Sequence, residues 1–187
     1  DESGRLVEPS LLTALIAESE LKKVPGGTII YSLISSRVVP EVIERCGGIP
    51  SRSRVGHSFI KAQMAETGAI FGGEHSGHFY FRDFWNADSG MLAALYAIAA
   101  LGNSSGTRNF SSIIDQYRKY FGSGEINSKV NDVSAAMERV EGHFLDRGQI
   151  DRLDGLTITS GEWWLNVRPS NTEPLLRLNV EADSDEI

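Results

Sequence analysis

The chain has 187 residues, enough for one large or two small domains, and its 41% hydrophobic and 23% charged residues are those of an ordinary globular protein. The formal net charge of −7 excludes a general attraction for nucleic acid or anionic membranes, so any anion must be bound by a local positive pocket. The single cysteine, Cys46, excludes an internal disulfide and favours a cytoplasmic location. No signal peptide is visible, and the most apolar stretch, 91–101, is shorter than the roughly 20 residues of a membrane span.

The first part of the chain alternates helical and strand patterns. In chain order we expect a hairpin strand at 5–8, a helix near 10–20, a strand at 28–34, a helix from 35–36 to 47–48, a strand near 49–54, a helix at 58–67 and a strand at 69–71. That order predicts an α/β three-layer domain with a mainly parallel sheet. Residues 89–101 are apolar almost all round, which predicts a buried helix.

The rest of the chain has a different pattern. A helix at 110–120 leads to a strand at 125–130, then to an amphipathic helix whose apolar face is Val133, Ala136, Met137, Val140 and Phe144. Strands follow near 149–152, 156–159, 162–167 and 175–181, and the last two alternate apolar and polar residues. Such alternation predicts a small α+β domain with an antiparallel sheet. We place the domains at 1–106 and 107–187.

Two glycines flank the polar loop Gly73-Glu74-His75-Ser76-Gly77-His78, which follows a short apolar run. Open α/β sheets bind ligands at the ends of such strands. Glycine lets the backbone approach a ligand, while the carboxylate, hydroxyl and imidazoles supply the acceptors and donors that a hydroxyl-rich molecule needs.

A second polar loop, Arg168-Pro169-Ser170-Asn171-Thr172, joins two predicted strands. The guanidinium of Arg168 offers two parallel donors to a phosphate, and the turn amides can form an anion-binding nest. On local chemistry alone, a plain polar turn explains the same residues, because Ser and Asn favour turns.

A third segment, Gly56-His57-Ser58-Phe59-Ile60-Lys61, opens a predicted helix. Helix N-termini bind anions, and His57 with Lys61 adds positive charge. The alternative is a routine helix start, with Ser58 as N-cap and Lys61 in solvent.

A zinc site at His75 and His78 is a weaker alternative, because neither an HExxH helix nor a cysteine pair accompanies them. Nucleophile-elbow, Walker and Rossmann patterns are also absent.

Together the three segments resemble the α-D-phosphohexomutase family, in the family's order. Residues 73–78 resemble its sugar-binding GExSGH loop, and we call them the sugar loop. Arg168 to Thr172 with Pro174 resembles its RxSNTxP phosphate loop, and 56–61 is similar to its GHS-x-x-K segment. The phosphomannomutase/phosphoglucomutase branch fits best, since the glucosamine branch usually has Gln where His75 stands. Some relatives carry a functional lysine at the position of Ile34, which leaves open whether Arg37 supplies that charge.

The resemblance covers the last two of four family domains, without the final helix, and implies an N-terminal half of the same protein as partner. That half carries the family's phosphoserine and its Mg²⁺-binding aspartate loop, so the cofactors implied are Mg²⁺ and hexose 1,6-bisphosphate. The implied activity interconverts hexose 6-phosphate and hexose 1-phosphate. We expect the 187-residue chain alone to be inactive, and a non-catalytic sugar-phosphate-binding module remains the alternative.

The resemblance also implies a role for each candidate residue. Glu74, Ser76 and His78 would bind or support the hexose hydroxyls, and Arg168, Ser170, Asn171 and Thr172 would bind the non-reacting phosphate. His57 is the candidate proton carrier, with Lys61 and Arg37 as secondary candidates. No metal ligand is expected in this part of the protein.

Overall fold

A computed structural model of the chain describes residues 1–103, 109–170 and 175–186. The chain forms two compact units, Asp1–Lys119 and Tyr120–Ile187, each of which is described by itself. The division lies later than the break at 106/107 placed from sequence. It does so because α5 (Phe110–Ile114) and the 3-10 turn η2 (Asp115–Tyr117) contact α1, and so stay with the first unit.

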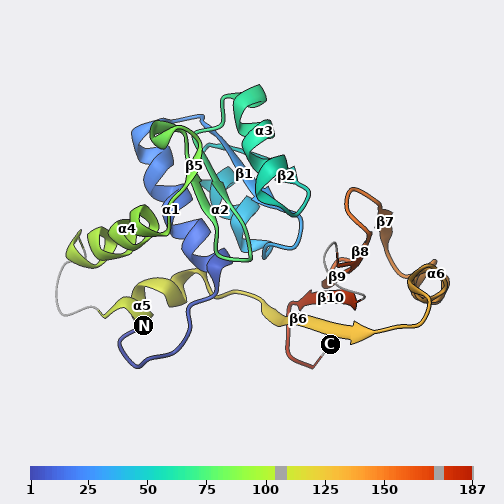
Figure 1. The fold of residues 1–187 in the computed structure, drawn as a ribbon. Coiled ribbons are helices and arrows are strands. Elements are labelled where there is room, and N and C mark those ends of the chain that lie inside the picture. Colours follow the sequence, from blue (N-terminus) through green and yellow to red (C-terminus); the bar gives the residue numbers. More distant parts are fainter. Residues whose placement is uncertain (104–108, 171–174, 187) are drawn as a thin grey trace. The chain divides into compact units, whose positions relative to one another are not determined.

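The first unit contains a mixed five-stranded sheet in the order β2-β1-β3-β4-β5 (Figure 1). Its strands are β1 (Thr28–Ser32), β2 (Ile49–Ser53), β3 (Phe71–Gly73), β4 (Phe79–Phe81) and β5 (Ala87–Asp88). β1 pairs in parallel with both β2 and β3, whereas β4 and β5 are antiparallel additions at one edge. The three parallel strands therefore end at the same edge of the sheet.

Helices cover both faces of this sheet. They are α1 (Pro9–Lys23), α2 (Val38–Arg45), α3 (His57–Thr67) and α4 (Gly90–Asn103). A Cβ added to Gly73 would lie 2.4 Å from the side chain of Thr13 in α1, whereas one added to Gly72 would lie 2.9 Å from Ile60 in α3. Because successive strand residues point to opposite faces, α1 and α3 lie on opposite sides of the sheet.

The strand register builds a separate apolar core on each face. Ile30, Gly72 and Tyr80 are cross-strand neighbours, and the core on their side includes Ile60 of α3. On the other side Phe71 faces Phe81, with ring centroids 5.2 Å apart. Tyr80 is thus a core residue on the α3 side, fully buried.

Helix α4 is largely exposed, which corrects the expectation of a buried helix over 89–101. Only Ala93 is buried, while Met91 and Ile98 are 74% and 64% exposed. The helix contacts α1 and α5, and Tyr96 stacks on Phe81. The apolar composition of α4 therefore does not correspond to burial among the described residues, and the helix presents an exposed apolar face.

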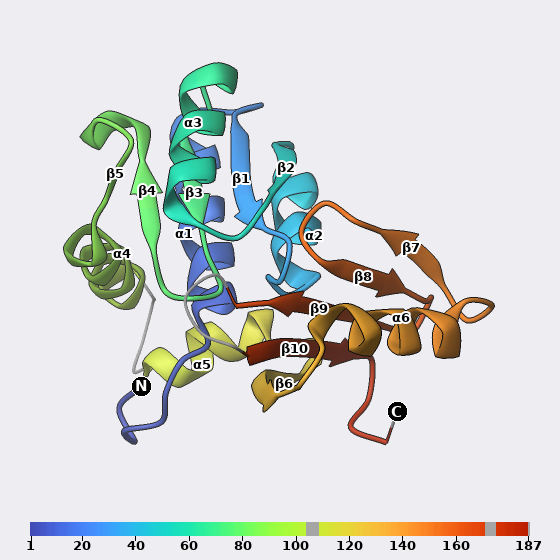
Figure 2. The same cartoon turned by 45° about the vertical axis from the view of Figure 1, so that its right-hand side comes forward.

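The second unit is an antiparallel sheet with one helix against it (Figure 2). Strand order is β6-β10-β9-β8-β7, from β6 (Phe121–Lys129), β7 (Gln149–Asp151), β8 (Leu156–Thr159), β9 (Trp163–Pro169) and β10 (Leu175–Ala182). Helix α6 (Val133–Phe144) begins where the Asp132 carboxylate accepts a hydrogen bond from the Ala135 amide at 3.0 Å. Its predicted apolar face packs on Leu165 and Val167.

The predicted fold class is confirmed in both units, and the differences are local. Residues 5–8 form no strand, and β3 begins at Phe71 rather than at 69. The expected helix at 110–120 ends at Tyr117, because β6 starts as early as Phe121. β4 and β5 were not predicted, since three- and two-residue strands are too short to show a period. In the described ranges no helix is long and apolar enough to cross a membrane.

Candidate functional site

The loops after β1, β2 and β3 bring three sequence segments to one edge of the first sheet. β1 leads to 33–37, β2 to 54–56 and β3 to the sugar loop. Each of these loops carries candidate residues, and direct contacts connect them. Open α/β sheets bind their ligands at the carboxyl ends of their parallel strands, which lie at this edge.

Glu74 is the most enclosed charged side chain of the sugar loop, with 2% of its surface exposed. Its Oε2 accepts a hydrogen bond from the Gly56 amide at 3.1 Å, and its Oε1 accepts one from the Tyr80 hydroxyl at 2.5 Å. The sugar loop and the segment 56–61 are therefore joined by one carboxylate. An ionised carboxylate has about four acceptor positions, and these two hydrogen bonds use one on each oxygen.

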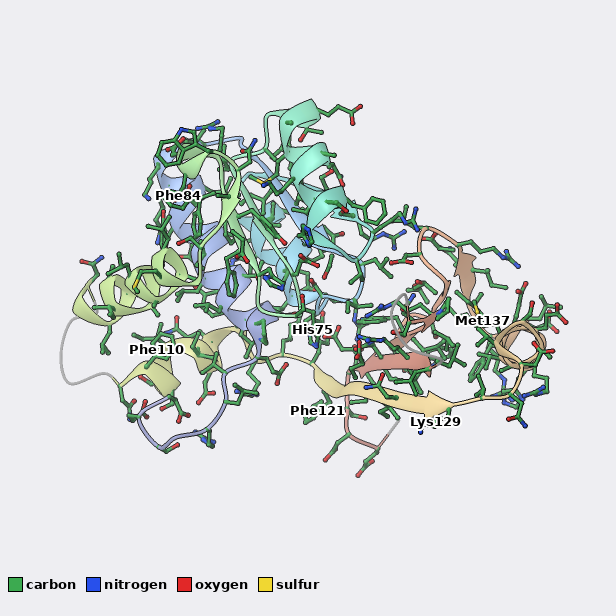
Figure 3. The ribbon with its side chains drawn as sticks, in the orientation of Figure 1. His75, Phe84, Phe110, Phe121, Lys129 and Met137 are labelled. Atoms are coloured by element: carbon green, nitrogen blue, oxygen red, sulfur yellow. The ribbon has the colours of Figure 1, made fainter. Side chains whose placement is uncertain are left out.

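His75 is held by a cluster of serines at the start of α1 and after β1. Its Nδ1 lies 3.0 Å from Ser10 Oγ, and its amide donates to Ser32 Oγ at 3.2 Å. Ser10 Oγ also accepts from the Ser36 amide at 3.1 Å, and Ser32 Oγ lies 3.0 Å from Ser35 Oγ. Figure 3 marks His75 at this end of the sheet. The cluster fixes the loop to the segment that contains Arg37.

The tip of the sugar loop is open to solvent. Ser76 is exposed, and Gly77 has φ +88°, a conformation that favours glycine. His78 is also exposed, and its Nδ1 lies 2.6 Å from an oxygen of Asp88, whose other oxygen accepts from the Phe79 amide at 2.9 Å. Asp88 thus orients the His78 ring, which leaves the other ring nitrogen for a ligand.

The candidate cations of this unit lie in the same loops or just after them. His57 begins α3 and Lys61 follows one turn later, both exposed, while half-buried Arg37 precedes α2. The alternative of Ser58 as N-cap is wrong. Gly56 occupies that position with φ +133°, and no side chain caps the helix. The first turn of α3 therefore presents amides without a capping side chain.

In the second unit, Arg168 belongs to a paired arginine site. Arg168 and Arg177 are directly opposite on β9 and β10, and Glu125 binds both, at 2.9 Å to each guanidinium. Arg177 also donates to Ser170 Oγ at 3.1 Å. Asn171 and Thr172, the other phosphate candidates, lie outside the described residues. Two facing guanidiniums are the donor groups that bind phosphate in proteins.

Several of these residues were missed from sequence. Arg177 was seen only as an alternating strand residue, yet an arginine in the strand that follows a phosphate loop was a usable signal. Tyr80, Asp88 and Ser10 had no local signal, because their roles depend on strand register and on chain packing. Glu125 lies 43 residues from Arg168 and carried no signal either.

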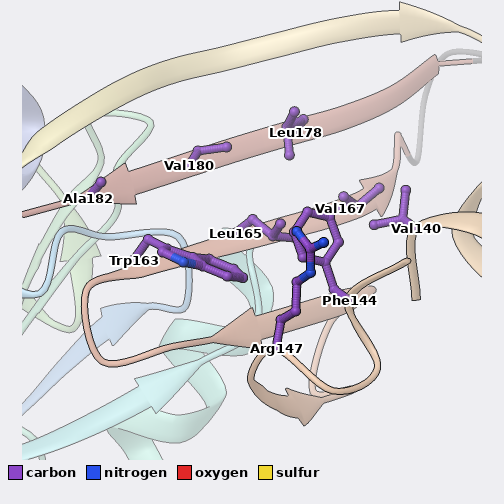
Figure 4. A pocket seen from close by; sticks show the side chains of 9 residues that line it. All are labelled: Val140, Phe144, Arg147, Trp163, Leu165, Val167, Leu178, Val180 and Ala182. Atoms are coloured by element: carbon purple, nitrogen blue, oxygen red, sulfur yellow. The ribbon is translucent and has the colours of Figure 1, made fainter. Parts of the chain in front are cut away.

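A pocket of about 450 Å³ lies on the other face of the second sheet, between α6 and the strands (Figure 4). Leu165, Val167, Leu178 and Val180 line it together with Arg147 at one side. Strand alternation directs Arg168 and Arg177 away from it. The pocket is apolar, so it does not fit a sugar phosphate.

Within the described residues, no group of three or more His, Cys, Asp or Glu side chains could hold a metal ion. In particular, His78 pairs with Asp88 and His75 contacts Ser10. The residues described here therefore do not fit a Mg²⁺ site, and the histidines give no support to zinc.

The two units define an α/β/α domain with polar loops at the strand ends, followed by a small α+β domain with an arginine pair. Comparison with known families agrees. The α/β/α domain III of phosphoglucomutase/phosphomannomutase matches residues 8–120, and the C-terminal domain of the same family matches residues 125–187. The chain belongs to the phosphoglucomutase/phosphomannomutase family and contains its last two domains.

Individual relatives are longer than this chain. A phosphomannomutase of Methanocaldococcus jannaschii is 44% identical over 185 residues, which cover 99% of this chain and 40% of that protein. A phosphomannomutase of Escherichia coli K12 is 41% identical over 186 residues, with 99% and 41% covered. The solved structure of a phosphoglucomutase/phosphomannomutase family protein from Burkholderia thailandensis has a TM-score of 0.85 at 29% identity, over 99% of this chain and 40% of that one. The chain spans about two fifths of the length of these relatives.

The paired arginines lead to a stability prediction. Glu125→Gln removes the negative charge that balances the facing guanidiniums of Arg168 and Arg177. All three side chains are less than a third exposed. We expect the unfolding free energy to fall by about 1–3 kcal/mol in urea titrations. Added inorganic phosphate should recover part of the loss, because it replaces the missing anion.

Glu141→Gln is the matched control. Glu141 pairs with Arg152, which is 62% exposed, so its loss should cost less than about 1 kcal/mol and should not respond to phosphate. Equal losses in the two variants, with no response to phosphate in either, would contradict the anion site.

Proposed function

We propose that the chain is the sugar- and phosphate-binding half of a phosphomannomutase/phosphoglucomutase that interconverts hexose 6-phosphate and hexose 1-phosphate. The observation that carries this proposal is the direct contact of the sugar loop with the start of α3 through Glu74 and Gly56, in a chain of the matching family. Ring hydroxyls and an anion have adjacent donors and acceptors there. A cytoplasmic location remains our prediction.

In the proposed site, the sugar loop recognises the hexose. Glu74 accepts hydrogen bonds from ring hydroxyls through its two remaining acceptor positions, and Ser76 and the free nitrogen of His78 contact the exposed side of the ring. Hydroxyls keep the same donor and acceptor character when the sugar turns end for end. The loop can therefore bind either orientation, as a mutase requires.

The arginine pair supplies the complementary part of the proposal. Arg168 and Arg177 bind the phosphate that does not react, with Ser170, Asn171 and Thr172 as further donors. Glu125 holds the two guanidiniums next to each other, because it accepts one hydrogen bond from each.

The proposed chemistry is two phosphoryl transfers. A hydroxyl of the bound hexose phosphate attacks the phosphorus of a phosphoserine, the serine P–O bond breaks, and the hydroxyl proton leaves to a base, for which His57 is the candidate. The resulting hexose 1,6-bisphosphate then returns its other phosphoryl group to the serine, with the proton transferred back. Positioning and electrostatics supply most of the catalysis, with Lys61 and Arg37 as nearby cations.

The phosphoserine and the Mg²⁺ belong, in this proposal, to the two domains that precede domain III in the family. Mg²⁺ neutralises phosphoryl charge when it is bound there. No described residue cluster of this chain fits the ion, so we derive no step through it.

We further propose that the preceding domains cover helix α4. The family models that match are domain III and the C-terminal domain, so the remaining length of the relatives belongs before residue 8. Residues 1–7 reach α5, where both oxygens of Glu2 accept hydrogen bonds from Ser111, and α5 contacts α4. A preceding domain would begin beside the uncharged, exposed face of Met91, Leu95 and Ile98.

A coupled assay tests the function. A protein that carries the two preceding domains should convert both mannose 1-phosphate and glucose 1-phosphate with Mg²⁺ and a trace of hexose 1,6-bisphosphate. The 187-residue chain should show no turnover under the same conditions, because it lacks the phosphoserine. Hexose phosphate binding without turnover by the longer protein would favour the non-catalytic module.

Calorimetry tests the phosphate loop. Arg168→Ala should weaken hexose phosphate binding by about 2 kcal/mol or more, since a charge-assisted bidentate contact is lost. Arg152→Ala removes an exposed arginine of the same unit and should leave the affinity within about twofold. An unchanged affinity in Arg168→Ala would count against this loop.

Hydrogen exchange tests the covering of α4. Amides of 90–103 should exchange at least about tenfold more slowly in a protein with the preceding domains than in the 187-residue chain. Amides of α3 serve as the internal control, and Ile98→Glu in the longer protein should restore fast exchange. Protection that instead grows with the concentration of the 187-residue chain would point to a second copy on α4.

A further inference from the structure

We propose that Tyr80 is a positioning residue, whose hydroxyl acts with the Gly56 amide to hold the Glu74 carboxylate in one orientation and thereby couples the sugar loop to the first turn of α3. The ligand side of this inference rests on the proposed function. The coupling itself stands on contacts within the first unit.

The two contacts fix different oxygens of the same carboxylate. Tyr80 donates to Oε1 at 2.5 Å and Gly56 donates to Oε2 at 3.1 Å. With one donor on each oxygen, the carboxylate plane cannot rotate without breaking a hydrogen bond. Because Glu74 is enclosed, water does not readily replace a lost partner, and the remaining acceptor positions point in fixed directions.

Tyr80 is well suited to be the fixed end of this arrangement. Its ring is fully buried against Ile30, Ile60 and Met64, and its backbone pairs with Gly72 in the sheet. Burial, together with the hydrogen bond to Glu74, raises the pKa of the Tyr80 hydroxyl. The hydroxyl therefore stays protonated and remains a donor at every physiological pH.

Gly56 is well suited to transmit a change. It is the N-cap of α3 with φ +133°, a region that side-chain-bearing residues rarely adopt. Its amide lies directly before His57, the first residue of α3, and donates to Glu74. A change in the position of the Glu74 carboxylate therefore changes the direction of this amide at the start of the helix. A ligand hydroxyl that donates a hydrogen bond to Glu74 also partly neutralises the carboxylate charge next to the positive N-terminal end of α3. Less negative charge there favours the binding of an anion at the same helix end.

The simpler alternative is that Glu74 merely satisfies a buried tyrosine hydroxyl. Tyr117 offers a control for that alternative. It is also buried in the first unit, and it donates to Glu18 Oε2 at 2.9 Å. It belongs to η2, however, and lies outside the loops that follow β1, β2 and β3. Tyr117→Phe and Tyr80→Phe each remove one tyrosine–carboxylate hydrogen bond and keep the ring.

The experiment combines exchange and kinetics in a protein with the two preceding domains. In Tyr80→Phe, the Gly56 and Phe59 amides should exchange roughly tenfold faster without ligand, the fold-change of one such hydrogen bond. With mannose 1-phosphate, kcat should fall roughly tenfold while KM changes less than about threefold. The hexose still binds, but Glu74 holds it less often in the reactive orientation. Tyr117→Phe should leave both readouts within about twofold.

Unchanged exchange at Gly56 in a folded Tyr80→Phe protein would overturn the coupling, as would equal effects of the two tyrosine variants. If Tyr80→Phe does not fold, Glu74→Ala decides by the same exchange readout. It removes both acceptor oxygens, so Gly56 exchange should again accelerate, and unchanged exchange there rejects the proposal. Absence of mutase turnover in the unmutated protein would reject the proposed function alone, since the exchange measurement needs no substrate.

Discussion

The enclosed Glu74 carboxylate is the constraint on which the rest of the first unit's site depends. A charge with 2% exposure is tolerated only if its oxygens are paired, and the partners come from two different segments, the Gly56 amide before α3 and the Tyr80 hydroxyl in β4. The need to pair this one group therefore brings β3, β4 and the start of α3 into a fixed relation. The loops that follow β1 join the same arrangement through the serines around His75.

In the second unit, two buried or half-buried positive charges need a negative partner. Arg168 and Arg177 face each other across β9 and β10, where like charges repel, and Glu125 of β6 binds both. Among the described residues, Glu125 is one carboxylate shared by two guanidiniums. Each unit thus contains a carboxylate that joins polar groups from different segments: Glu74 in the first and Glu125 in the second.

Helix α4 illustrates how a sequence signal can be right about chemistry and wrong about structure. A buried helix was expected over 89–101, yet in the observed α4 only Ala93 is buried. Contacts with α1 and α5 leave most of its apolar residues exposed. In relatives more than twice as long as this chain, additional protein is available to cover such a face.

The sequence by itself determined the fold class of both units, most element positions and the family. The spacing of apolar residues and the composition of short polar loops, such as 73–78 and 168–172, are visible within a few neighbouring residues of the sequence. Only the tertiary structure decided which groups act together: that Tyr80 and Gly56 share Glu74, that Asp88 orients His78, and that Arg177 and Glu125 complete the site of Arg168. These pairings depend on strand register and on chain segments up to 52 residues apart, which no local pattern encodes.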